Sequence, residues 1–159
     1  MHPDAHDKRI KATQDYFRLA DQGRPEVLDL FHDNAEIYFP KFGFGFGRQS
    51  LFEMTRGFAG TLEFIRHDYD AMTFICAGDY VVVEGTFHGR MSGKAWTGGV
   101  TPGGRFCNVF KFRGDRISSL HVYLDPGYTA RISTSANHQP RTQGSHGSGT
   151  RRVAGHSCR

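Results

Sequence analysis

The chain has few cysteines and no long apolar run. Its three cysteines, Cys76, Cys107 and Cys158, are odd in number and widely spaced, without a Cys-x-x-Cys motif. This pattern indicates neither a disulfide framework nor a cysteine-rich zinc site. No apolar run approaches the roughly 18 residues of a membrane-spanning helix, and the polar first residues lack a secretory-signal pattern. We therefore expect a cytoplasmic protein without membrane contact.

Acidic residues are absent from the end of the chain. After Asp125 there is no Asp or Glu, but there are five arginines: Arg131, Arg141, Arg151, Arg152 and Arg159. The other 15 of the 20 basic residues are therefore nearly balanced by the 16 acidic ones. We expect one domain over residues 1–132 and a disordered, basic Gly/Ser-rich tail over residues 133–159. Nucleic-acid binding by this tail is the less favoured alternative.

Helices precede strands in the expected order of elements. Apolar periodicity predicts a helix over residues 4–20, and Pro25 suits the first turn of a second, short helix. A strand over 35–39 and a helix over 48–58 follow. The rest is expected to be strand, at residues 62–76, 80–91, 106–113 and 116–125. This order predicts an α+β fold with the helices on one face of a sheet.

The segment Phe42–Gly47 alternates phenylalanine with glycine. A glycine-rich turn before a helix can bind phosphate, but the spacing is not G-x-G-x-x-G and no G-K-[ST] follows. We interpret the segment as a flexible loop that presents three phenylalanines on one side. A second glycine-rich loop, residues 89–104, carries Trp96, which we expect to be exposed as a lid or dimer contact.

Alternation along the last two strands separates inward from outward residues. One face of the first strand consists of Phe106, Asn108, Phe110 and Phe112. Because this face is apolar, Asn108 is expected to be a buried or cavity-lining amide. The apolar face of the last strand consists of Leu120, Val122 and Leu124. On its other face His121 and Asp125 are about 13 Å apart, too far for a direct hydrogen bond, so we do not assign them as a catalytic pair.

The element order and several local strings resemble the nuclear-transport-factor-2-like superfamily. These strings are Ala20–Gly23 before Val27–Ala35, and Gly114–Ile117 before His121–Asp125. The resemblance covers about residues 8–128 and is nearest to the SnoaL-like polyketide cyclase branch. It implies helices packed on a strongly bent, mixed but mainly antiparallel sheet, which forms a cone around an internal pocket. It also implies a homodimer through the outer face of the last strands.

Scytalone dehydratase, another member of the superfamily, suggests where the catalytic residues lie. Its catalytic His is at the start of the strand where this chain has His67, and its Asp is in the turn where this chain has Asp21. A carboxylate beside an imidazole fixes the tautomer and raises the basicity of the ring, as a general acid–base pair requires. The alternatives are a helix-capping carboxylate for Asp21 and a structural histidine for His67.

The chain departs from the superfamily at three catalytic positions. Phe39 replaces the Asp base of ketosteroid isomerase, and Val122 replaces the acidic residue of SnoaL-type cyclases and limonene epoxide hydrolase. Gly85 stands where scytalone dehydratase has a second His. We therefore expect an apolar pocket whose substrate-binding residues are Tyr16, Phe39, Asn108, Phe110 and Val122. No metal or organic cofactor is implied.

The resemblance implies cofactor-independent proton transfer, of isomerase, cyclase or dehydratase type, on an apolar polyketide- or terpenoid-like molecule. His67 is expected to transfer the proton, oriented by Asp21. Asn108 and Tyr16 are expected to bind a developing oxyanion. The alternative is a non-catalytic small-ligand-binding or dimeric interaction module of the same fold, which the missing acidic groups favour.

Overall fold

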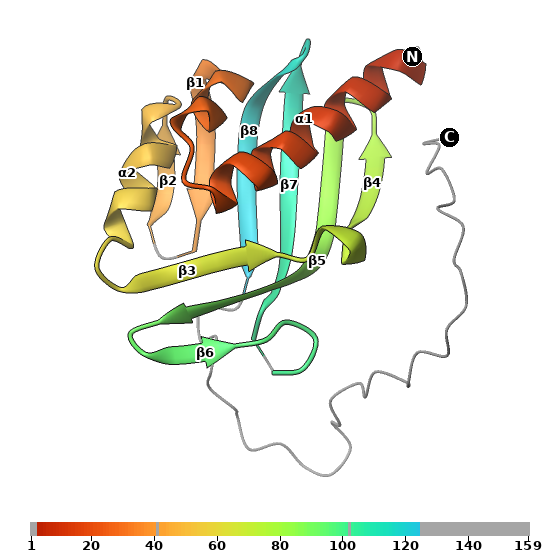
Figure 1. Ribbon diagram of the computed structural model, residues 1–159. Helices are drawn as coiled ribbons and strands as arrows, with labels where there is room; N and C mark the ends of the chain where they lie inside the picture. The colour runs from red at the N-terminus through yellow and green to blue at the C-terminus, as the bar shows by residue number, and fades with distance from the viewer. Residues whose placement is uncertain (1–2, 41, 102, 125–159) are drawn as a thin grey trace, which may run out of the picture.

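The protein consists of helices packed against one large mixed sheet (Figure 1). The computed structural model describes residues 3–40, 42–101 and 103–124. The predicted domain end at residue 132 and the predicted tail lie outside these residues. The α+β prediction is confirmed, and the described strands do not close into a barrel. None of the helices in these ranges is long and apolar enough to cross a membrane.

The helices and strands follow closely the order expected from the sequence. They are α1 (Pro3–Asp21), η1 (Pro25–Leu30), β1 (Phe31–Phe39), β2 (Gly43–Phe46), α2 (Gln49–Gly57), β3 (Leu62–His67), η2 (Tyr69–Ala71), β4 (Thr73–Ala77), β5 (Tyr80–Met91), β6 (Lys94–Trp96), β7 (Arg105–Arg113) and β8 (Arg116–Leu124). η1 and η2 are 3-10 helices. β1 starts earlier than the predicted residue 35 because its parallel pairing with β8 already begins at Phe31, opposite Ile117.

The strand order is β2-β1-β8-β7-β5-β3, and β4 and β6 also pair with β5. Only β1 and β8 run parallel among these pairs. β5 curves strongly in Figure 1, so that its first part pairs with β4 and its second part with β3. The single strand predicted over 62–76 is therefore wrong: the chain breaks at η2, where it passes from one part of β5 to the other.

The core lies between α1 and the inner face of the sheet. α1 buries one face at three- and four-residue spacing, formed by Arg9, Thr13, Tyr16 and Phe17. The ring of Phe17 packs 5.3 Å from that of Phe106 and 5.9 Å from that of Phe110, centroid to centroid. Burial of one such side chain stabilises the fold by about 1.5–3 kcal/mol. The predicted inward faces of β7 and β8 are confirmed by the burial of Phe106, Asn108, Phe110, Phe112, Leu120 and Val122.

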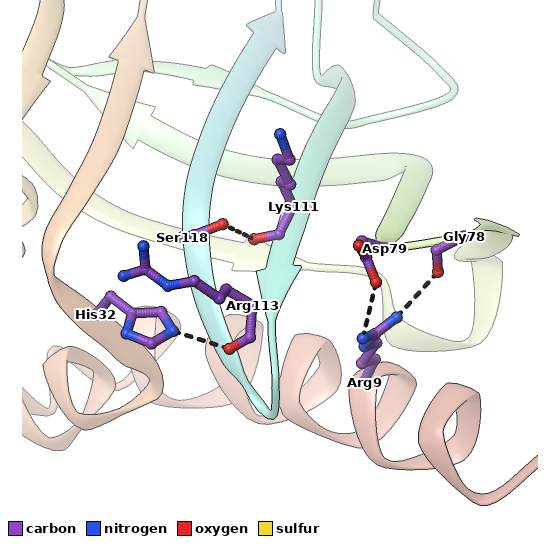
Figure 2. Close-up of polar contacts among 7 residues, drawn as sticks. All are labelled: Arg9, His32, Gly78, Asp79, Lys111, Arg113 and Ser118. Atoms are coloured by element: carbon purple, nitrogen blue, oxygen red, sulfur yellow. Dashed lines mark hydrogen bonds and ion pairs between the residues drawn. The ribbon is translucent and has the colours of Figure 1, made fainter. Parts of the chain in front are cut away.

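Polar contacts fasten α1 and β1 to two turns of the sheet (Figure 2). Arg9 on α1 donates to the carbonyl oxygen of Gly78 at 2.9 Å and forms an ion pair with Asp79 at 3.0 Å, in the β4–β5 turn. At the start of β1, Nε2 of His32 donates to the carbonyl oxygen of Arg113 at 2.8 Å, where β7 ends and the turn to β8 begins. The direction of α1 across the sheet is thereby fixed, and with it the position of the last residue of the helix.

The segment Phe42–Gly47 contains a strand rather than the predicted flexible loop. β2 pairs antiparallel with β1. On one face, a Cβ at Gly45 would lie 2.6 Å from Cβ of Ser50 on α2, so only glycine lets the helix approach this closely. On the other face, Phe44 and Phe46 are 59% and 74% exposed. Glycine and phenylalanine thus alternate because successive residues of a strand point to opposite faces of the sheet.

Trp96 is buried, so the prediction of an exposed lid is wrong. It lies on β6, within the segment predicted as a loop, and is only 2% exposed. Its ring packs edge-on against Phe87 at a centroid distance of 5.7 Å. A Cβ at Gly89 would lie 2.5 Å from this ring. The absence of a side chain at Gly89 therefore makes room for the indole beside β5.

Candidate active site

A cavity of about 350 Å³ lies between the end of α1, η1, α2 and the inner face of the sheet. Most of the side chains in its wall are apolar. The aromatic ones are Tyr16, Phe39, Phe52, Phe58, Phe87, Trp96 and Phe106. The polar ones are Tyr16, Asp21, Arg24, Thr55, His67 and Asn108. Only these few polar side chains can therefore form hydrogen bonds or exchange protons with a ligand in the cavity.

Asp21 reaches the cavity because α1 ends there. Gly23 adopts a positive φ of 64°, and the backbone N–H of Arg24 donates back to the carbonyl oxygen of Leu19 at 2.9 Å. This left-handed glycine is a common way to terminate a helix. The carboxylate of the last helical residue is thereby turned towards the sheet.

Asp21 and His67, the two predicted catalytic residues, are in direct contact. Nδ1 of His67 lies 2.6 Å from Oδ1 of Asp21, and the backbone N–H of His67 donates to Oδ2 at 2.8 Å. The side chains are only 6% and 13% exposed. Because an ionised carboxylate only accepts, Nδ1 carries a proton, and in the neutral ring Nε2 holds the lone pair. Nε2 makes no hydrogen bond to any described residue.

Three phenylalanines from three elements enclose the His67 ring. Phe17 of α1, Phe87 of β5 and Phe106 of β7 have ring centroids 4.8, 5.6 and 4.9 Å from that of His67. His67 is the last residue of β3, whereas the sequence placed it near the start of a long strand. The three phenylalanines restrict the orientation of the imidazole plane, and the hydrogen bond to Asp21 fixes the position of Nδ1.

Tyr69 is a third member of this cluster that the sequence analysis missed. Its hydroxyl donates to Oδ2 of Asp21 at 2.7 Å. Burial by itself would raise the pKa of Asp21, but the hydrogen bonds and charge of His67 and the bond from Tyr69 outweigh burial and lower it. Partial burial and the bond to Asp21 raise the pKa of Tyr69 to about 12. The only signal in the sequence was that Tyr69 follows His67 by two residues.

Tyr16 and Asn108 bring unpartnered polar groups to the cavity. Asn108 is 3% exposed, and its Oδ1 has no hydrogen-bond partner in the described part of the chain. The Tyr16 hydroxyl also makes no hydrogen bond to a described residue. Burial, and secondarily the charge of Asp21, raise the pKa of Tyr16, so its hydroxyl keeps its proton. Buried polar groups without partners are uncommon, and a ligand hydroxyl, which both donates and accepts, would satisfy Oδ1 of Asn108 and the Tyr16 hydroxyl.

The other predicted substrate-binding residues divide into two groups. Phe39 and Val122 lie in the cavity wall. Phe110 does not line it: this residue is fully buried in the core, with its ring centroid 5.2 Å from that of Tyr16. At Gly85 a Cβ would lie 2.9 Å from the ring of Phe106, so a second histidine does not fit there without displacing that ring.

The family of the chain is shown by its match to a family model. Residues 13–120 match the model of the SnoaL-like domain. The chain belongs to the SnoaL-like domain family. This confirms the resemblance inferred from the local strings, whereas a search of curated protein sequences finds no match.

Solved structures share the fold of this SnoaL-like domain. An NTF2-like protein from Anabaena variabilis is 22% identical, with a TM-score of 0.64 over 78% of this chain and 95% of that one. TerC, co-crystallised with polyporic acid, is 20% identical, with a TM-score of 0.60 over 74% and 92%. A candidate polyketide cyclase from Xanthomonas campestris pv. campestris is 12% identical, with a TM-score of 0.64 over 75% and 91%. These likenesses confirm the NTF2-like cone fold.

The SnoaL-like domain carries a second histidine–carboxylate pair on the outer face of the sheet. Nε2 of His121 lies 2.7 Å from Oε1 of Glu36, and the rings of Tyr38 and Phe44 lie 5.8 and 5.7 Å from its own. Glu36 was not predicted from the sequence because only the parallel pairing of β1 with β8 brings it near His121. Asp125 lies outside the described residues. Neither member of the pair lines the cavity.

Within the described ranges, no three His, Cys, Asp or Glu side chains gather as metal ligands would. Each histidine pair instead consists of one imidazole and one carboxylate in direct hydrogen-bond contact. This arrangement is suited to holding or moving a proton.

Proposed function

We propose that this SnoaL-like domain is a cofactor-independent enzyme that transfers a proton on an apolar, polyketide- or terpenoid-like molecule, as an isomerase, cyclase or dehydratase. The observation that carries the proposal is the 2.6 Å contact between His67 Nδ1 and Asp21 Oδ1 in the wall of the cavity. A general base needs one nitrogen held in place and the other directed at the substrate. His67 lines the cavity, Asp21 holds its Nδ1, and its Nε2 makes no hydrogen bond to a described residue; this supports the role of His67 as the base.

His67 is the acid–base group of the proposed reaction. Its Nε2 removes a proton from the carbon beside a substrate carbonyl, and the electron pair of the C–H bond moves to give an enolate. Asp21 holds Nδ1–H and stabilises the imidazolium that forms. Return of the proton to another carbon completes an isomerisation. Its delivery to a β-hydroxyl, which leaves as water while the enolate electrons form a C=C bond, completes a dehydration.

Tyr16 and Asn108 are the groups that stabilise the enolate oxygen. Both line the cavity, and the Tyr16 hydroxyl makes no hydrogen bond to a described residue. The raised pKa of Tyr16 keeps its hydroxyl available as a donor, and the amide nitrogen of Asn108 is the second donor. One such donor contributes about 10²- to 10³-fold to kcat.

The composition of the cavity supports an apolar ligand. Among the described residues, Arg24 is the only Lys or Arg in the wall, and it pairs with Glu26 at 2.5 Å. The volume of about 350 Å³ is that of a small-molecule pocket. TerC, which shares the fold, was crystallised with polyporic acid, and this supports a small organic ligand here.

We also propose that the enzyme is a cytoplasmic homodimer that associates through the outer face around His121. Phe44, Phe46 and Tyr123 on this side of the sheet are 59%, 74% and 47% exposed, and exposed apolar patches mark interaction surfaces. In a two-fold contact the patch meets its own copy. A net charge would then repel itself, but the carboxylate of Glu36 on this face is hydrogen-bonded to the His121 ring at 2.7 Å. No nucleic-acid partner forms part of the proposal.

The proposal is tested by deuterium exchange in D₂O with a panel of apolar ketones and hydroxyketones, followed by NMR. We expect exchange at carbons beside the carbonyl, and a loss of at least about 100-fold in His67→Gln. The matched control is His88→Gln, because His88 packs against Phe64 outside the cavity wall. If ligands raise the melting temperature but no deuterium exchange is detected, the protein is a non-catalytic binding module instead.

A further inference from the structure

The Asp21 carboxylate is held by a residue that is not part of the cavity wall. The Tyr69 hydroxyl donates to Oδ2 at 2.7 Å, but Tyr69 does not line the cavity. We propose that Tyr69 is a positioning residue that fixes the carboxylate of Asp21 and, through it, the tautomer and orientation of His67. This inference rests on the proposed role of His67 as the base.

Three hydrogen bonds use both oxygens of the carboxylate. Oδ1 accepts from the His67 ring, and Oδ2 accepts from the His67 backbone N–H and from the Tyr69 hydroxyl. The terminal torsion of an aspartate has broad minima, so its plane is fixed only by donors at both oxygens. Tyr69 is the one side chain besides His67 that supplies a donor among the described residues. Its bond therefore restricts the rotation that would misalign Oδ1 with Nδ1.

The break between β3 and β4 brings Tyr69 to this position. Tyr69 is the first residue of η2, and the preceding backbone N–H, of Asp68, donates to the carbonyl oxygen of Thr86 on β5 at 3.0 Å. On the other side, the guanidinium of Arg18 lies 5.9 Å from the centre of the Tyr69 ring. Arg18 and Asp21 both belong to the last turn of α1, so the ring and its hydroxyl are both directed at this helix end.

Core packing does not explain the contact. Tyr69 is 39% exposed, so its ring contributes little to the apolar core. The charged and titratable groups that face the Asp21–Tyr69 pair are His67, Tyr16, Arg18 and Arg66. Of these, only His67 donates a hydrogen bond to the carboxylate. Removal of the Tyr69 hydroxyl therefore leaves Oδ2 with the backbone donor alone.

The test is Tyr69→Phe, which keeps the ring and deletes the hydroxyl. Its matched control is Tyr80→Phe, because Tyr80 is 41% exposed and also has a cation, Lys111 Nζ, 5.4 Å from its ring centre. We expect Tyr69→Phe to shift or broaden the downfield NMR signal of the His67 Nδ1 proton. We also expect kcat for proton exchange to fall about tenfold with KM little changed, and Tyr80→Phe to change neither.

The NMR signal separates this inference from the proposed function. An unchanged Nδ1 proton signal in Tyr69→Phe overturns the positioning role, whatever the activity. A shifted signal in Tyr69→Phe but not in Tyr80→Phe supports it, even if the wild-type protein catalyses no exchange and the proposed function fails. Equal shifts in both variants would reflect a general loosening of the fold and would also overturn it.

Discussion

Nδ1 of His67 lies 2.6 Å from Oδ1 of Asp21, although 46 positions separate the two residues in the chain. The contact joins the last residue of α1 to the last residue of β3. A glycine-terminated helix and a strand that ends where the sheet bends bring the two side chains to one wall of an apolar cavity.

Asp21→Asn is expected to lower proton exchange by at least about 100-fold. The amide keeps the size of the side chain, but it no longer stabilises an imidazolium and can present an N–H to Nδ1, which favours the wrong tautomer. The measurement is kcat for deuterium exchange. Asp15→Asn is the control, because Asp15 is also on α1 but pairs with Lys11 and Arg18 at the surface; equal losses in both variants would contradict the account.

Asp21 is also expected to make stability depend on pH. Its pKa in the folded protein is lower than the ordinary value of 3.8, so the unfolded chain binds the proton more readily. The carboxylate therefore contributes stability above pH 3.8, and this contribution is lost as the pH falls through the lower, folded pKa. Urea unfolding of the wild type and of Asp21→Asn at several pH values measures this contribution to the free energy of unfolding. A stability difference that stays constant from pH 6 to pH 3, as set in the buffers, would count against this linkage.

Asn108→Leu is expected to separate stability from activity. Oδ1 of Asn108 is buried without a partner in the described part of the chain, so an apolar side chain of similar volume removes an unfavourable desolvation. The melting temperature should stay the same or rise, whereas kcat should fall about 10²- to 10³-fold as one oxyanion donor is lost. A large fall in melting temperature would show that the amide has a structural role instead.

Phe46→Glu is expected to disrupt the proposed homodimer. Phe46 is 74% exposed on β2, and in a two-fold contact each substitution places a charge in an apolar interface. Sedimentation velocity measures the oligomeric state. Phe64→Glu is the matched control, since Phe64 is 49% exposed on β3, away from β1, β2 and β8. A wild-type protein that is monomeric at every concentration would exclude the dimer.

The sequence predicted best what depends on local pattern. Alternation identified the buried face of β7 and placed Asn108 on it, because side chains of a strand alternate wherever the strand pairs. The proximity of Asp21 and His67 came from the family resemblance rather than from spacing. Their catalytic role stays a prediction.

What the sequence did not predict depends on contacts between distant segments. Glu36 reaches His121 only because β1 pairs in parallel with β8. Tyr69 reaches Asp21 only because the chain breaks at η2 to follow the bend of β5. The strand at Gly43–Phe46 was not predicted because glycine has a low preference for strands. Its glycines are explained only by the close packing of α2 on that face, which the sequence alone does not show.

The central claim is that His67 transfers a proton rather than serving the fold. The most direct test measures, for one exchanging ligand, both its dissociation constant and its deuterium-exchange rate in the wild type and in His67→Gln. We predict similar dissociation constants and an exchange rate at least about 100-fold lower in the variant. An exchange rate that is the same in both proteins, with the ligand bound equally well, would contradict the account.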